Sequence, residues 1–373
     1  MRWCKNCVLP DTRPNLLIDA DGVCNACRSS LVKTEIDYGS RQHAFQEVVA
    51  AAKARAGSGY DCLVPVSGGK DSTWQVITCL EAGLRVLAVT WRTPGRTAIG
   101  QANLDNLISL GVDHIDYTID PAVDARFMLR TFEDLGSPAI PMHLALFNIP
   151  LTVAVRLRIP LVIWGENSAA EYGSPDGTDI GSRLDRAWLR RYGVSSGTTA
   201  EDWLGEHLSE KDLIAYRGPS DEDLAAAGVR AVFLGHFFPW DPDRTRAIAE
   251  QHGFQAAAEA RTGLYAFADI DDDFISIHHW MKWPKFGFTR LFDNLSLEIR
   301  NGRMTRDAAL EFLREAGDQM PLPDIDRFCR FVGIDSARFQ EIVESHRNRA
   351  VWQQRSDGAW WIPDFIINEW VWT

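Results

Sequence analysis

Short apolar runs alternate with segments of helical periodicity between residues 43 and 235. The strands that we predict from this pattern lie at 62–66, 85–91, 114–119, 159–164 and 229–234. Helical spacing of apolar residues occurs at 43–55, 73–81, 98–110 and 145–158. Continuous apolar runs are typical of strands buried on both faces, and strand–helix alternation favours a parallel sheet. We therefore predict an α/β domain in this part of the chain.

The pattern changes on either side of this α/β domain, to which we assign residues 41–235. Residues 1–40 are loop-rich, with a hairpin turn predicted at Asp19–Gly22. Residues 236–373 are predicted to form a mostly helical C-terminal domain. Its helical spacing is found at 245–251, 306–315 and 335–346. Within the α/β domain, residues 168–228 are polar and mixed, and we interpret them as an insertion that faces the substrate.

Composition narrows the class of protein. Hydrophobic residues make up 46% and charged residues 24% of the 373 residues, as in soluble globular proteins. The net charge of -12 argues against broad, charge-driven binding to nucleic acid. No run of 18 uninterrupted apolar residues and no signal-peptide core is apparent, so we expect a cytoplasmic protein without a membrane segment. The C-terminal tryptophans are expected to pack the tail onto the body, with a partner interface as the alternative.

Four of the seven cysteines form two C-x-x-C pairs, Cys4 with Cys7 and Cys24 with Cys27. Two such pairs supply the four thiolates of a tetrahedral zinc site, which would be structural because protein fills every position. An iron–sulfur cluster is the alternative for the same ligands. The isolated cysteines are expected in the core; they are Cys62, Cys79 and Cys329.

The hexapeptide Ser67-Gly68-Gly69-Lys70-Asp71-Ser72 lies where a predicted strand ends and a helix begins. Helix N-termini bind phosphate through free N–H groups, and glycine allows close approach of the backbone. We expect the whole hexapeptide to bind phosphate. Lys70 adds positive charge and Asp71 is the expected Mg²⁺ ligand. Ser67, Lys70 and Asp71 are the expected catalytic residues.

This hexapeptide resembles the PP-loop of the N-type ATP pyrophosphatases. The resemblance implies a HUP (adenine nucleotide alpha hydrolase-like) α/β fold, with ATP and Mg²⁺, and activation of an acceptor by adenylation. In that superfamily the main chain of the second strand cradles adenine, a position that Thr90 and Trp91 occupy here. Gly165, Glu166 and Asn167 resemble a later Gly-containing motif of the superfamily, and they are expected to bind nucleotide, metal or substrate.

The cysteine pairs together with the phosphate loop resemble the N-acetyl sugar amidotransferases of surface-polysaccharide and pseudaminic-acid-type biosynthesis. Further stretches resemble this family in the same order; they are 3–14, 165–173, 238–241, 278–290 and 298–306. The resemblance implies that the acetamido oxygen of an N-acetyl sugar, expected to be nucleotide-linked, is adenylated and that ammonia replaces AMP to give an acetamidino sugar. It also implies a separate glutaminase subunit, with a synthase-like barrel protein as a further partner.

Charged residues after these motifs are candidates for substrate binding. His278, His279, Arg300, Arg303 and Arg306 belong to cationic clusters that bind phosphate or form a solvated face. Asp176 and Asp179 are further candidates in the insertion. The residues we select for the substrate are Glu171, Lys282, Lys285 and Arg290.

Three other functions compete with this interpretation. A PP-loop tRNA-modifying enzyme, such as a thiolase or lysidine-type ligase, would need a basic surface that the net charge disfavours. A ligase forming an amide or amidine on a non-sugar acceptor would use the same loop. A non-catalytic ATP-binding subunit would bind ATP without releasing AMP.

Overall fold

A sheet of five parallel strands forms the centre of the protein, in a computed structural model that describes residues 1–172, 174 and 182–372. The strand order is β3-β2-β1-β4-β5. The strands are β1 (Cys62–Pro65), β2 (Val86–Trp91), β3 (Asp113–Tyr117), β4 (Leu161–Trp164) and β5 (Arg230–Phe233). All five predicted strands are confirmed, with ends that shift by no more than two residues.

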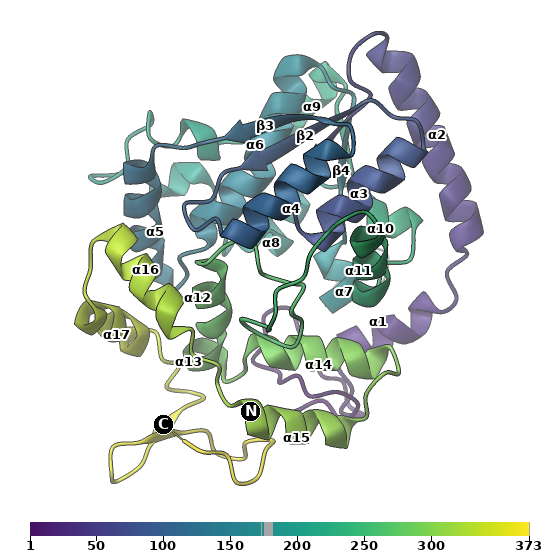
Figure 1. The fold of residues 1–373 in the computed structure, drawn as a ribbon. Coiled ribbons are helices and arrows are strands. Elements are labelled where there is room, and N and C mark those ends of the chain that lie inside the picture. The colour runs from purple at the N-terminus through teal and green to yellow at the C-terminus, as the bar shows by residue number, and fades with distance from the viewer. Residues whose placement is uncertain (173, 175–181, 373) are drawn as a thin grey trace.

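Helices cover both faces of the sheet (Figure 1). On one face lie α2 (Tyr38–Ala56), α3 (Lys70–Glu81) and α4 (Ala98–Ser109), and on the other α5 (Pro121–Leu135) and α6 (Ile140–Leu157). Val64 of β1 packs toward the first face and Leu63 toward the second. The sequence patterns did not predict α5, although Pro121 at its start and Gly136 after its end are common helix boundaries.

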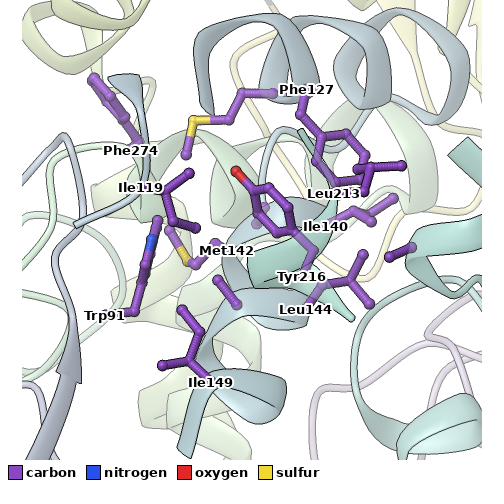
Figure 2. Packing of buried hydrophobic residues seen from close by; sticks show 14 of the residues in the cluster. Trp91, Ile119, Phe127, Ile140, Met142, Leu144, Ile149, Leu213, Tyr216 and Phe274 are labelled. Carbon is purple, nitrogen blue, oxygen red and sulfur yellow. The ribbon is translucent and has the colours of Figure 1, made fainter. Parts of the chain in front are cut away.

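Helix α6 is long and apolar enough to cross a membrane by length and composition, but half of it is buried. It packs on β1, β2 and β4 and on α5. Figure 2 shows its residues Ile140, Met142 and Ile149 within the core. This is the position of a core helix in an α/β protein.

The insertion contributes to the same core. Its described elements are α7 (Ser168–Tyr172), α8 (Arg186–Tyr192), η1 (Ala200–Trp203), η2 (Ile214–Tyr216) and α9 (Asp221–Ala227). Helix η2 packs on α6, and Tyr216 is fully buried in the core (Figure 2). The Tyr216 hydroxyl donates a hydrogen bond to Asp124. Asp176 and Asp179 lie outside the described residues. That the insertion faces the substrate stays a prediction.

The C-terminal part is mostly helical, as predicted. Its helices are α10 (Leu234–Phe237), α11 (Pro242–Gln251), α12 (Ile275–Trp280), α13 (Lys282–Phe286), α14 (Arg290–Arg300), α15 (Arg306–Ala316), α16 (Leu322–Val332) and α17 (Ser336–Ser345). A short antiparallel pair, β6 (Gln353–Gln354) and β7 (Trp360–Trp361), follows. The tail packs on the body as expected, since Trp370 is 8% exposed and its ring lies 5.3 Å from that of Trp283.

The N-terminal segment, with its helix α1 (Asn25–Lys33), packs on these C-terminal helices rather than standing alone. Leu9 and Leu16 share a hydrophobic core with Phe292 and Leu295 of α14. Figure 1 shows α14, α15 and both chain ends together below the sheet. The predicted turn at Asp19–Gly22 is present, with the Gly22 N–H donating to the Asp19 carbonyl over 3.1 Å.

Candidate functional site

The phosphate loop lies at the point where the strand order reverses. The chain runs from β1 outward to β2 and β3, then returns to β4 on the other side of β1. In open α/β sheets, ligands bind outside the carboxyl ends of the strands at such a switch point. The loop residues follow β1, and Gly165 and Glu166 follow β4, so both motifs meet at this edge.

The loop conformation requires glycine at position 68. Gly68 has a φ of +89°, and a Cβ there would lie 2.7 Å from the Leu104 nitrogen of α4. Gly69 is the N-cap of α3. The first turn of this 12-residue helix therefore presents free N–H groups and the positive end of its dipole beside the loop.

Replacing Gly68 with alanine should lower the free energy of unfolding by about 2–3 kcal/mol, because backbone strain and a clash act together. Gly302→Ala is the matched control, since Gly302 has a φ of +70° with nothing within 4 Å of its added Cβ. It should lose only about 1 kcal/mol, the cost of the left-handed conformation. Urea unfolding measures both variants, and equal losses would contradict the clash at Gly68.

Asp71 and Lys70 are held in place by the segment around α11. Asp71 Oδ1 accepts hydrogen bonds from Trp240 Nε1 and Thr245 Oγ1, both over 3.0 Å. Lys70 is 5% exposed, and its ammonium pairs with Asp71 and lies 3.3 Å from Thr245 Oγ1. Helix α11 packs directly on α3. The loop therefore presents one fixed cation and one fixed carboxylate.

A cavity of about 190 Å³ opens in front of the loop and has two walls. One wall is the α/β side, with the loop, Glu166 and Trp240. The other wall comes from the C-terminal part of the chain. Its members are Tyr265, Phe267, Ala268, Asp269, Ile270, Asp271, Arg290 and Asn294. Of our four substrate candidates, only Arg290 lines this cavity.

The opposite wall carries two carboxylates that the sequence patterns did not single out. The Asp271 carboxylate accepts a hydrogen bond from Ser67, and burial raises its pKa. Asp269 pairs with Arg290 Nε over 3.2 Å and with His279 Nε2 over 3.3 Å. Burial opposes ionisation of Asp269, but Arg290 and then His279 lower its pKa. The signal in the sequence was the acidic run at 269–273.

The three residues after β4 have different structural roles. A Cβ at Gly165 would lie 2.4 Å from Gln75 Nε2, so any other residue would have to displace the Gln75 side chain of α3. Glu166 lines the cavity, and burial together with the nearby Asp71 carboxylate raises its pKa to about 7. The Asn167 side chain accepts from the Ala169 N–H over 3.1 Å and Trp188 Nε1 over 3.2 Å, so it caps α7 and does not line the cavity.

Thr90 and Trp91 direct their side chains into the protein. Thr90 Oγ1 donates to the Val66 carbonyl over 2.8 Å. The Trp91 ring is 7% exposed and lies in the core near Ile119 and Met142 (Figure 2). Only their main chain is left for the nucleotide contact that the resemblance implies.

The other three substrate candidates are engaged elsewhere. Lys282 Nζ donates to the buried Asp293 over 2.8 Å, and Lys285 Nζ donates to the Leu135 carbonyl over 2.6 Å. Glu171 pairs with Lys33 of α1.

The neighbouring cationic residues are also paired within the protein. Arg300 donates to the Glu171 carbonyl, Arg303 pairs with Glu298 and Asp241, and Arg306 donates to the Cys7 carbonyl. His278 Nδ1 lies 3.1 Å from the Ser137 hydroxyl. The contacts of Arg300, Arg306 and His278 tie the C-terminal part to the rest of the chain.

Lys285 should make stability depend on pH. Burial lowers its pKa to about 8. The unfolded chain therefore binds more protons than the folded chain above pH 8, so stability should rise with pH toward the ordinary lysine pKa near 10.4. Urea midpoints between pH 8 and 10 should rise less in Lys285→Met than in the wild type. Lys211→Met, at an exposed lysine, should keep the wild-type slope, and an equal slope in Lys285→Met would contradict the effect.

The four cysteines of the N-terminal segment converge. Their Sγ atoms all lie within 4.8 Å of one another and are buried. The Cys4–Cys27 and Cys7–Cys24 sulfur pairs are 4.0 and 3.7 Å apart. A tetrahedral zinc ion with Zn–S bonds of about 2.3 Å requires sulfur separations of about 3.8 Å. These sulfur separations therefore fit a single tetrahedral zinc ion. Cys62, Cys79 and Cys329 are buried in the core, as predicted.

Comparison with known proteins shows a similarity in the C-terminal part. Residues 262–364 match the family described as LPS biosynthesis protein WbpG-like, C-terminal domain. Comparison with curated proteins gave no match. Among solved structures, NMN synthetase from Francisella tularensis is similar at 13% sequence identity, over 60% of this chain and 99% of that chain, with a TM-score of 0.26. The matched range includes the wall of the cavity that faces the phosphate loop, from Tyr265 to Asn294.

Proposed function

We propose that this protein is an ATP-dependent amidotransferase acting on an N-acetyl sugar. The proposal starts from the similarity of residues 262–364 to the WbpG-like C-terminal domain of LPS biosynthesis. One observation carries the proposal. The phosphate loop and the WbpG-like domain form opposite walls of the same cavity. A loop suited to the phosphates of ATP therefore faces a domain of polysaccharide biosynthesis.

The reaction forms an amidine in two steps. The acetamido oxygen attacks the α-phosphorus of ATP, and pyrophosphate leaves. Neutral ammonia then adds to the activated carbon, and AMP leaves with the original acetamido oxygen while a proton is released. The product carries an acetamidino group, and no general base is needed to create the nucleophile.

The residues of the cavity fit these steps. Lys70 and the N–H groups at the start of α3 hold the leaving pyrophosphate, where negative charge accumulates. Asp71 and Glu166 offer the carboxylate oxygens that Mg²⁺ prefers, and their mutual repulsion would be relieved by a cation. Bound Mg²⁺ would supply further charge stabilisation to the phosphates. Ser67 orients Asp271, and Arg290 with Asp269 presents the substrate from the opposite wall.

Three further parts of the proposal concern partners, location and the zinc site. A separate glutaminase subunit, with a synthase-like barrel protein as a second partner, supplies ammonia. The reaction takes place in the cytoplasm, where ATP is available. Zinc in the four-cysteine cluster is structural and holds the N-terminal segment against α14.

The test traces the acetamido oxygen of the sugar with an isotope label. The protein is incubated with ATP, Mg²⁺, ammonium and a panel of nucleotide-linked N-acetyl sugars labelled with ¹⁸O in the acetamido group. We expect sugar-dependent AMP that carries the label and a product with nitrogen in place of oxygen. AMP released only with unmodified tRNA would indicate RNA modification, and ADP in place of AMP would overturn the assignment.

A further inference from the structure

A second cavity lies in the C-terminal domain and is not used by the proposed reaction. It measures about 400 Å³ and shares no lining residue with the cavity at the phosphate loop. Helices α12, α13 and α17, the end of α15 and the last residues of the chain enclose it. Six tryptophans line it; they are Trp280, Trp283, Trp352, Trp360, Trp370 and Trp372.

Two of these indoles have unused hydrogen-bond donors. Trp280 is 6% exposed and Trp352 is 3% exposed. Within the described part of the chain, the buried Nε1 of each has no hydrogen-bond partner. Buried indole N–H groups normally find a partner, because leaving one unpaired costs about 1–3 kcal/mol. Both residues line the cavity, but these two N–H groups are shielded from solvent, so the two indole rings offer a ligand apolar surface and not a hydrogen-bond donor.

The aromatic wall is braced by its own contacts. The Trp283 ring stacks on Trp372 at 6.3 Å and meets Trp352 edge-on at 4.9 Å. The Arg347 guanidinium lies over Trp352 at 4.8 Å and over Trp360 at 5.2 Å. Rings fixed in this way offer flat apolar surfaces that a ligand meets without a large cost in conformational entropy.

The polar lining favours an uncharged ligand rich in hydroxyl groups. Asp318, Gln340 and Glu344 supply oxygen acceptors, and Gln340 also supplies donors. Arg347 is the cation of the lining, and it pairs with Glu344. Two carboxylates around one neutralised guanidinium repel a phosphate group.

We propose that this cavity binds the pyranose ring of a saccharide. The axial C–H groups of a pyranose form an apolar face that packs on indole rings, while its hydroxyls accept from the Gln340 amide and donate to the carboxylates of Asp318 and Glu344. Cavities of this size, lined by aromatic rings with a few polar groups, are typical ligand sites. The site is independent of the phosphate loop and does not rest on the proposed reaction.

Ligand-detected saturation-transfer NMR with the full-length protein tests this site. Glucose, galactose and N-acetylglucosamine are the probes, at up to about 50 mM, since single sugars bind with millimolar Kd. We expect saturation transfer to at least one sugar. Gln340→Ala should weaken binding about 3- to 10-fold, the loss expected for one hydrogen bond. Trp352→Phe should also weaken binding, because it removes part of the aromatic surface on which the sugar packs.

Controls separate this site from the phosphate loop. Trp361→Phe changes a tryptophan outside the cavity and should bind sugar like the wild type. Asp71→Asn should retain sugar binding even where it loses AMP release. No transfer to any of the three sugars, or equal transfer to the wild type and both cavity variants, would overturn the proposal. Displacement of the sugar by AMP in the wild type and not in Asp71→Asn would assign the signal to the loop cavity and also overturn it.

Discussion

Asp71→Asn is expected to reduce the rate of AMP formation by about 10²- to 10³-fold, the usual effect of removing one group that stabilises transition-state charge. Asparagine keeps the shape of the side chain and can still accept from Trp240 and Thr245. It loses the charge that pairs with Lys70 and that we propose for Mg²⁺. The measurement is the initial rate of AMP release with saturating ATP and sugar.

The control for this variant is Asp105→Asn, which removes an exposed carboxylate of α4. It should turn over like the wild type. Circular dichroism and the melting temperature of Asp71→Asn should match those of the wild type to within a few degrees. An Asp71→Asn protein that folds and retains wild-type AMP release would remove Asp71 from the mechanism.

Cys4→Ser should abolish metal binding and lower the melting temperature by about 10 °C or more, because the binding free energy of a structural zinc contributes directly to folding. The loss should extend to the C-terminal helices, since Cys4 and Cys7 lie in one core with Phe292. Elemental analysis of the purified protein gives the zinc content, and calorimetry gives the melting temperature.

Cys329→Ala is the matched control for the zinc prediction, because Cys329 is a buried cysteine far from the cluster in the chain. It should keep about one zinc per chain. Iron in place of zinc in the wild-type protein would favour the alternative metal. A Cys4→Ser protein that keeps both its zinc and its melting temperature would contradict the structural role.

Local sequence patterns predicted the parts of the fold that depend on residues close together in the chain. Strands β1, β2 and β4 were predictable because apolar runs such as 159–164 are buried on both faces. Strand β3 lies at the edge of the sheet and is largely part-exposed. The loop at Ser67–Ser72 was predictable because its glycines and helix start follow a strand directly. The convergence of Cys4, Cys7, Cys24 and Cys27 was predictable because spacing alone brings each pair together.

The opposite wall of the cavity was not predictable in the same way. Asp269 and Asp271 reach the loop only through packing of segments about two hundred residues apart, which no local pattern encodes. The sequence also could not show which residues Lys282 and Lys285 contact. Their charge favoured a substrate role, but distant partners bind them inside the protein, such as Asp293 and the Leu135 carbonyl. For Trp91, strand alternation directs the side chain into the core.

The shared core of the two chain ends has a consequence for the order of biosynthesis. The Val8 N–H bonds to Ser296, and Trp3 bonds to the Asp364 carbonyl. During translation, the N-terminal segment is made first but cannot bury its apolar residues until the last helices have left the ribosome. Contacts of such long sequence separation form late in folding. The wall facing the phosphate loop would then be completed only in full-length chains, and nascent or truncated chains would be unable to consume ATP.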